Sequence, residues 1–123
     1  MPRPGDEKQE LRGDLYMKYD EYELLEMFES EPIFLATKEA GLYRYSYIGK
    51  NNVKIVLYIS VYENECDISL YLHENPLFKA GLTDVEFIRQ ENNSLRIHQK
   101  NIKKDYLLHF KPSICIVIED PIN

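Results

Sequence analysis

The alternation of apolar and other side chains between residues 53 and 73 is the feature that most restricts the fold. From Val53 to Tyr62 every odd-numbered side chain is aliphatic, and Cys66 to His73 repeats the pattern with Ile68, Leu70 and Leu72. A period of two is typical of a strand with one buried face. The segment between the two runs, Glu63-Asn64-Glu65, is expected to turn the chain, so the pattern predicts an antiparallel β-hairpin.

We expect this hairpin to pair Val61 with Ile68, which places Tyr58 beside Tyr71 on the face opposite the aliphatic rows. This register keeps the apolar side chains together, whereas a shift by one residue would separate them. Tyr58 and Tyr71 then become candidates for partner binding, because tyrosine is enriched in protein interfaces.

The tyrosines of the preceding segment, Leu42 to Ile48, leave two alternatives open. If Tyr43, Tyr45 and Tyr47 point inward, Arg44 remains in solvent; if they point outward, they extend the exposed tyrosine surface. We favour the inward orientation, because a buried arginine would need a partner to offset the loss of hydration.

Further strands are expected along the rest of the chain. A second hairpin would pair Phe87 with Leu95, which sets Glu86 against Arg96 and Asp84 against His98. Pro76 and Gly81 predict a loop over 75–83. The apolar run at the C-terminus shows no alternation, as expected for a strand covered on both faces at the centre of a sheet. Including Leu42–Ile48, the strand candidates outside the first hairpin are Ile33–Ala36, Leu42–Ile48, Asp84–Arg89, Ser94–His98, Tyr106–Phe110 and Ser113–Ile118.

One amphipathic helix is predicted over Asp20 to Ser30, with Asp20 as its N-cap and Pro32 limiting its extension. Its apolar residues cluster on one side, while Glu23, Glu26 and Glu29 fall on the other. The predicted fold class is therefore α+β: a single antiparallel sheet of about six or seven strands with this N-terminal helix packed against it. Residues 1–13 are expected to form a disordered polar tail, and residues 14–123 a single domain.

The net charge of −6 lies entirely within residues 1–31, which hold ten acidic and four basic residues, while the remainder is neutral. Such an end attracts basic proteins and repels nucleic acid and anionic lipid. The first hypothesis is accordingly a small non-catalytic protein-binding module, such as an inhibitor, an immunity-type protein or a regulator, with a basic protein partner. Its expected contacts are Glu23, Glu26, Glu29, Tyr58 and Tyr71.

The sequence contains no phosphate-binding glycine loop, dinucleotide fingerprint or paired-cysteine zinc spacing. We therefore assign no catalytic residue, no metal ligand and no cofactor. The alternatives are a nucleic-acid-binding protein that uses the basic loop 96–111, or a small-ligand-binding or enzymatic domain without a recognisable motif. The candidate nucleic-acid contacts are Arg96, Lys100, Lys103 and Lys104.

The location expected from the sequence is cytoplasmic, without a membrane partner, because the chain has neither an apolar run of about 18 residues nor a signal-like start. Cys66 and Cys115 each lie in a strand-like run and are expected to be unpaired and buried. A homodimer could form through an exposed edge strand, but the sequence does not indicate which strand lies at an edge.

Overall fold

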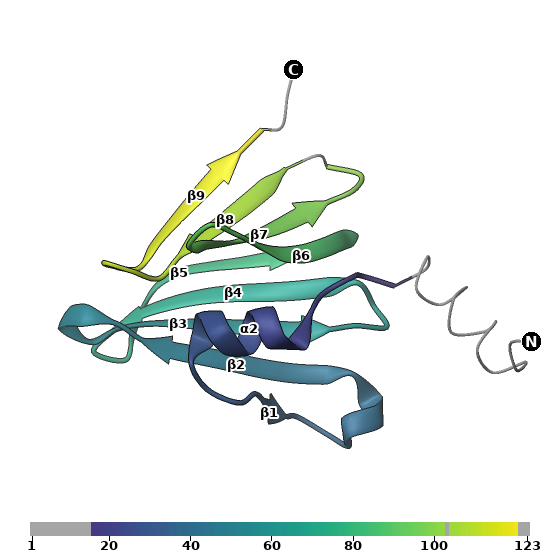
Figure 1. The fold of residues 1–123 in the computed structure, drawn as a ribbon, viewed down its shortest axis with the longest axis horizontal. Helices are drawn as coiled ribbons and strands as arrows, with labels where there is room; N and C mark the ends of the chain where they lie inside the picture. The colour runs from purple at the N-terminus through teal and green to yellow at the C-terminus, as the bar shows by residue number, and fades with distance from the viewer. Residues whose placement is uncertain (1–15, 103, 121–123) are drawn as a thin grey trace, which may run out of the picture.

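The computed structural model describes residues 16–102 and 104–120, and within them it contains two antiparallel sheets and one α-helix (Figure 1). The mainly antiparallel α+β class is confirmed, but the single sheet of six or seven strands is wrong. The predicted tail at 1–13 lies outside the described residues.

Helix α2 spans Glu21–Phe28. The five-stranded sheet runs in the order β1 (Ile33–Phe34), β2 (Leu42–Ile48), β3 (Val53–Ser60), β4 (Glu65–Leu72) and β5 (Asn75–Leu82), and the four-stranded sheet in the order β6 (Val85–Glu91), β7 (Ser94–Gln99), β8 (Asp105–His109) and β9 (Cys115–Glu119).

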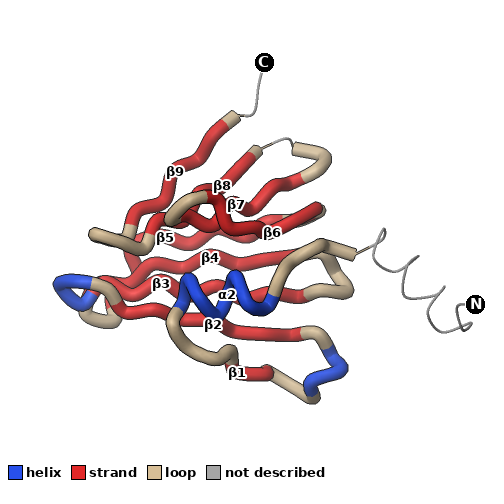
Figure 2. The backbone as a smooth tube through the Cα atoms, viewed as in Figure 1, coloured by secondary structure: helices blue, strands red, loops and turns tan. Residues whose placement is uncertain are grey.

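The two sheets and the helix share one hydrophobic core. Each sheet turns an apolar face to this core, and the helix adds Leu24, Met27 and Phe28. Alternation of apolar residues shows that a strand has a buried face but not which sheet it joins. For this reason the sequence did not reveal that the strands divide into two sheets. The chain passes from β5 to β6 through Thr83 and Asp84, where Asp84 has a left-handed φ of 53°. Figure 2 shows the strands of the two sheets in red and helix α2 in blue.

Helix α2 begins as predicted. The Asp20 carboxylate accepts hydrogen bonds from the backbone N–H groups of Tyr22 at 2.8 Å and Glu23 at 3.3 Å, which satisfies two of the free donors at the helix start. Glu29 is the C-cap of the helix: its φ of 57° is left-handed, and its N–H donates to the Leu25 carbonyl. No helix within the described residues is both long and apolar enough to cross a membrane.

The first hairpin forms, but its predicted register is wrong. Ile59 pairs with Cys66, so Tyr58 lies opposite Asp67 and Tyr71 lies opposite Lys54. The predicted pairing of Val61 with Ile68 fails because the chain turns earlier, ending in Asn64 with a left-handed φ of 56°. The observed register is shifted from the predicted one by an even number of residues. Each side chain of the hairpin therefore still points to the face of the sheet that was predicted for it.

The second hairpin also forms in another register. Ile88 pairs with Ile97 around the two-residue turn Asn92-Asn93, and a bulge lies between Val85 and Phe87. Predicted pairs such as Phe87 with Leu95 and Glu86 with Arg96 are therefore wrong, because the left-handed φ of 57° at Asn92 sets a tighter turn than the three residues expected.

Two further expectations fail at the sheet edges. The predicted loop at 75–83 contains strand β5, in which Pro76 lies next to a bulge opposite Tyr71, a position that tolerates proline. The C-terminal strand β9 ends the order of its sheet rather than occupying the centre, and Cys115, Val117 and Ile118 are exposed. Both cysteines are unpaired, but only Cys66 is buried as expected.

The inward orientation of the β2 tyrosines is confirmed. Tyr45 is buried in the core, and Tyr43 and Tyr47 are half-buried against it. Arg44 occupies the opposite face of the sheet beside Tyr58. The side of β2 that holds Tyr43 and Tyr45 thus faces helix α2, which contacts β2 directly.

Candidate protein-binding site

The acidic residues of the described N-terminal segment gather on and around helix α2. Residues 16–31 hold six acidic residues and one base. The helix contacts β6 along one side and β2 along another, so its carboxylates are divided between two environments.

The three glutamates predicted to bind a partner lie on the β6 side, and each has an internal contact. The carboxylate of Glu23 accepts a hydrogen bond from the Gln90 backbone N–H at 2.9 Å, and that of Glu26 accepts one from the Gln90 side-chain amide at 3.3 Å. Glu29 forms an ion pair with Lys111. These contacts fasten the helix to the second sheet, and a direct role in partner binding remains a prediction.

Replacement of Glu23 by alanine is expected to lower the free energy of unfolding by about 1–2 kcal/mol, because a part-buried N–H of β6 loses its acceptor. Glu23→Gln keeps a carbonyl oxygen and should lose less. Glu26→Ala removes only an exposed contact and should change stability by less than about 0.5 kcal/mol. Urea unfolding of the three variants provides the measurement, and equal losses for Glu23→Ala and Glu26→Ala would contradict it.

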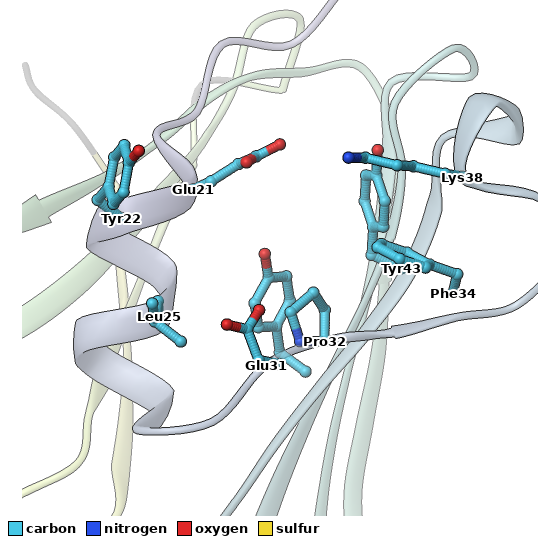
Figure 3. Close-up of a pocket in the computed structure, with 9 residues that line it drawn as sticks. Glu21, Tyr22, Leu25, Glu31, Pro32, Phe34, Lys38 and Tyr43 are labelled. Carbon is cyan, nitrogen blue, oxygen red and sulfur yellow. The ribbon is translucent and has the colours of Figure 1, made fainter.

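The β2 side of the helix borders a cavity of about 220 Å³. Figure 3 shows that the carboxylate of Glu21 and the ammonium of Lys38 point toward one another across it, with the carboxylate of Glu31 between helix and strands. Neither carboxylate forms an ion pair with any residue within 16–102 and 104–120. The lining residues are Glu21, Tyr22, Leu25, Glu31, Pro32, Phe34, Lys38, Tyr43 and Tyr45. We call this space the α2–β1 cavity.

Exposed aromatic side chains line the α2–β1 cavity, and exposed aliphatic residues flank one of them in the sequence. Tyr22 is 81% exposed and Phe34 44% exposed, and both line it. Ile33 and Leu35, on either side of Phe34, are about half exposed as well. Apolar surface next to charged groups is typical of the energetically important part of a protein interface.

Two tyrosine hydroxyls resist ionisation, one from Tyr45 in the cavity lining and one from Tyr19, whose ring lies next to that of Tyr43. Burial, followed by the nearby carboxylate of Glu21, raises the pKa of Tyr45 to about 12. Burial and a side-chain contact with Tyr43 raise the pKa of Tyr19 above its ordinary value. At neutral pH these groups are uncharged and can donate or accept hydrogen bonds, so the negative charge of the cavity comes from Glu21 and Glu31.

Tyr58 and Tyr71 lie elsewhere, on the face of the five-stranded sheet opposite the core. Both are half-buried and border a shallow depression of about 280 Å³ together with Asp67 and Lys79. The Lys54 ammonium lies 5.3 Å from the centre of the Tyr71 ring. The structure therefore does not bring these tyrosines together with the helix glutamates into one surface, and their role as contacts stays a prediction.

The residues of the nucleic-acid alternative differ in their surroundings. Arg96 forms ion pairs with Glu91, Asp105 and Glu119, so acidic groups already neutralise its charge. Lys100 and Lys104 are exposed, whereas Lys103 lies outside the described residues. Within the described part of the chain, no three His, Cys, Asp or Glu side chains converge as a metal ion would require.

Sequence reasoning missed Glu21 and Glu31 as site residues. A helical projection separates apolar from acidic positions, but it cannot show which flank of the acidic side meets another element. The one available signal was the exposed apolar run Ile33-Phe34-Leu35 directly after Glu31 and Pro32, which is too short to identify a site without the fold.

The comparisons with known proteins bear on the fold. No protein-family model matches the sequence, and no curated protein matches it. A chain in the solved structure of a contact-dependent growth inhibition toxin–immunity protein complex from Klebsiella pneumoniae 342 superposes with a TM-score of 0.73, at 22% sequence identity. The match covers 84% of this chain and 96% of that chain, so the two chains share a fold over nearly the whole of the Klebsiella chain.

Proposed function

We propose that this chain is a small, non-catalytic, immunity-type protein that binds and neutralises a basic protein toxin. The observation that carries the proposal is the shared fold with a chain of a toxin–immunity protein complex. The acidic character of this chain favours the immunity role in such a pair, because a surplus of carboxylates attracts a basic toxin.

The distribution of charge supports this function. Five carboxylates are exposed on and around helix α2, namely those of Asp20, Glu21, Glu26, Glu29 and Glu31. Lys18 is the one basic residue of the segment 16–31. A concentrated negative potential accelerates association with a partner of opposite sign and orients its approach. The exposed apolar side chains around the α2–β1 cavity then supply contact area that charge alone does not provide.

A growth assay tests the proposal. The proteins encoded by the two genes that flank the gene of this chain are expressed separately in the bacterial cytoplasm, with and without this chain. One of them is expected to stop growth when expressed alone, and co-expression of this chain should restore colony counts and yield a stable complex on purification. The control is an unrelated acidic protein of similar size and charge, which should not restore growth. Toxicity that persists in the presence of this chain, or no toxicity from either neighbour, contradicts the proposal.

A further inference from the structure

The α2–β1 cavity offers two carboxylates to a cationic guest. Glu21 approaches from the helix and Glu31 from the segment leading to β1, so the two charges enclose the space from different elements (Figure 3). Among the described residues neither has a salt-bridge partner, in contrast to Glu29 on the other side of the helix. Two carboxylates that border one space both attract a cation placed between them.

Tyr45 gives an independent indication of a polar guest. The residue is only 2% exposed, yet it lines the cavity, and its hydroxyl forms no hydrogen bond with any residue that the structure describes. Every fully buried side-chain oxygen and nitrogen in that part of the chain has a partner, so the Tyr45 hydroxyl must open onto the cavity. Because it has no partner among the described residues, this hydroxyl can form a hydrogen bond only with water or with a ligand in the cavity, and a donor group of a ligand would satisfy it.

The aromatic side chains that line the cavity favour a guanidinium over an ammonium. The rings of Phe34 and Tyr43 lie 5.5 Å apart in an edge-to-face arrangement, and both border the cavity. A planar guanidinium can stack on such a ring while it donates two parallel hydrogen bonds to one carboxylate, whereas an ammonium is a compact point charge that cannot do both. Arginine is also enriched among the residues that dominate protein interfaces.

Lys38 also lines the cavity, and its ammonium would compete with a cationic ligand for the carboxylates. Its ammonium faces the Glu21 carboxylate across the cavity, but the two groups form no salt bridge (Figure 3). Lys38 is exposed, so its side chain is free to leave when another cation enters. Its positive charge would oppose the entry of a basic guest, and its removal should therefore strengthen binding.

We propose that the α2–β1 cavity receives the guanidinium of an arginine side chain from the basic partner, held by Glu21, Glu31 and the Tyr45 hydroxyl. This inference rests on the proposed function and adds to it the pocket and the residue type that the pocket recognises.

The first test measures the affinity of the toxic neighbour for variants of this chain by calorimetry. The double variant Glu21→Gln with Glu31→Gln is expected to bind about 10-fold or more weakly, and Lys38→Met more tightly. The matched control, Glu63→Gln with Glu74→Gln, removes the same charge from exposed turns and should weaken binding less than threefold. Equal losses for the two double variants would attribute the effect to net charge and overturn the inference.

A second test uses a probe in place of the partner. N-acetyl-arginine amide, added at millimolar concentration, should shift the ring NMR signals of Tyr43 and Tyr45 in the wild type. N-acetyl-citrulline amide, which has nearly the same shape without the charge, should not, and neither probe should act on the Glu21→Gln, Glu31→Gln variant. Absent shifts, or equal shifts with both probes, overturn the inference.

The failure of this inference can be told from the failure of the proposed function. Growth rescue and tight binding that survive in the double variant would overturn the inference and leave the proposed function intact. A wild type that neither binds nor rescues refutes the proposed function itself.

Discussion

Replacement of Phe28 by alanine is expected to lower the free energy of unfolding by about 3–5 kcal/mol, enough to unfold much of a marginally stable protein. Phe28 is 1% exposed at the end of helix α2. Its ring lies 5.2 Å from that of Tyr45 in β2 and 4.9 Å from that of Phe110, which follows β8. One side chain therefore joins the helix to both sheets, and its loss leaves a cavity that none of the three elements can fill alone.

The measurement is thermal or urea unfolding, with Tyr22→Ala as the matched control from the same helix. Tyr22 is 81% exposed, so its truncation removes an aromatic ring without opening the core and should cost less than about 0.5 kcal/mol. Phe28→Leu keeps most of the apolar volume and should fall between the two. A loss below about 1 kcal/mol for Phe28→Ala would mean that the helix does not connect the sheets as the structure shows.

Local patterns in the sequence predicted elements better than they predicted pairings. The alternation of Val53 to Tyr62 and the cap at Asp20 each depend on neighbouring residues, and both have structural counterparts at β3 and α2. The strand pairings depend on where the left-handed residues Asn64 and Asn92 turn the chain, and the sequence does not single these out from the other asparagines. Sheet membership depends on contacts between distant residues, which periodicity does not contain.

The functional surface was predicted in part. The acidic helix was identified from charge, and it does carry exposed carboxylates. The choice of Glu23, Glu26 and Glu29 followed a helical projection that could not include Gln90 or Lys111, the residues that those glutamates contact. The cavity at Glu21 and Glu31 forms only in the folded chain, because β1 and β2 lie along a different side of the helix from the one that contacts β6.

The second large effect is expected at Asp105. The Asp105 carboxylate is almost buried in β8, where it forms an ion pair with Arg96 and lies 2.5 Å from Nδ1 of His98. Replacement by asparagine keeps the shape but removes the charge, which leaves a partly buried guanidinium short of one partner. We expect a loss of about 2–3 kcal/mol at pH 7.

This loss should depend on pH. Burial opposes ionisation of Asp105, but hydrogen bonds from His98 and Arg96 outweigh it, so the pKa of the carboxyl is lowered below its ordinary value. A carboxyl with a lowered native pKa stabilises the fold fully above the pKa of the unfolded chain, near 3.9, and this contribution disappears as the pH falls through the native pKa. The stability difference between wild type and Asp105→Asn should thus be largest near neutral pH and shrink below about pH 4. Urea unfolding at a series of pH values measures it, with the exposed Asp67→Asn as control. A difference that stays constant down to pH 3 would show that Asp105 contributes through shape and hydrogen bonding, with no contribution from its charge.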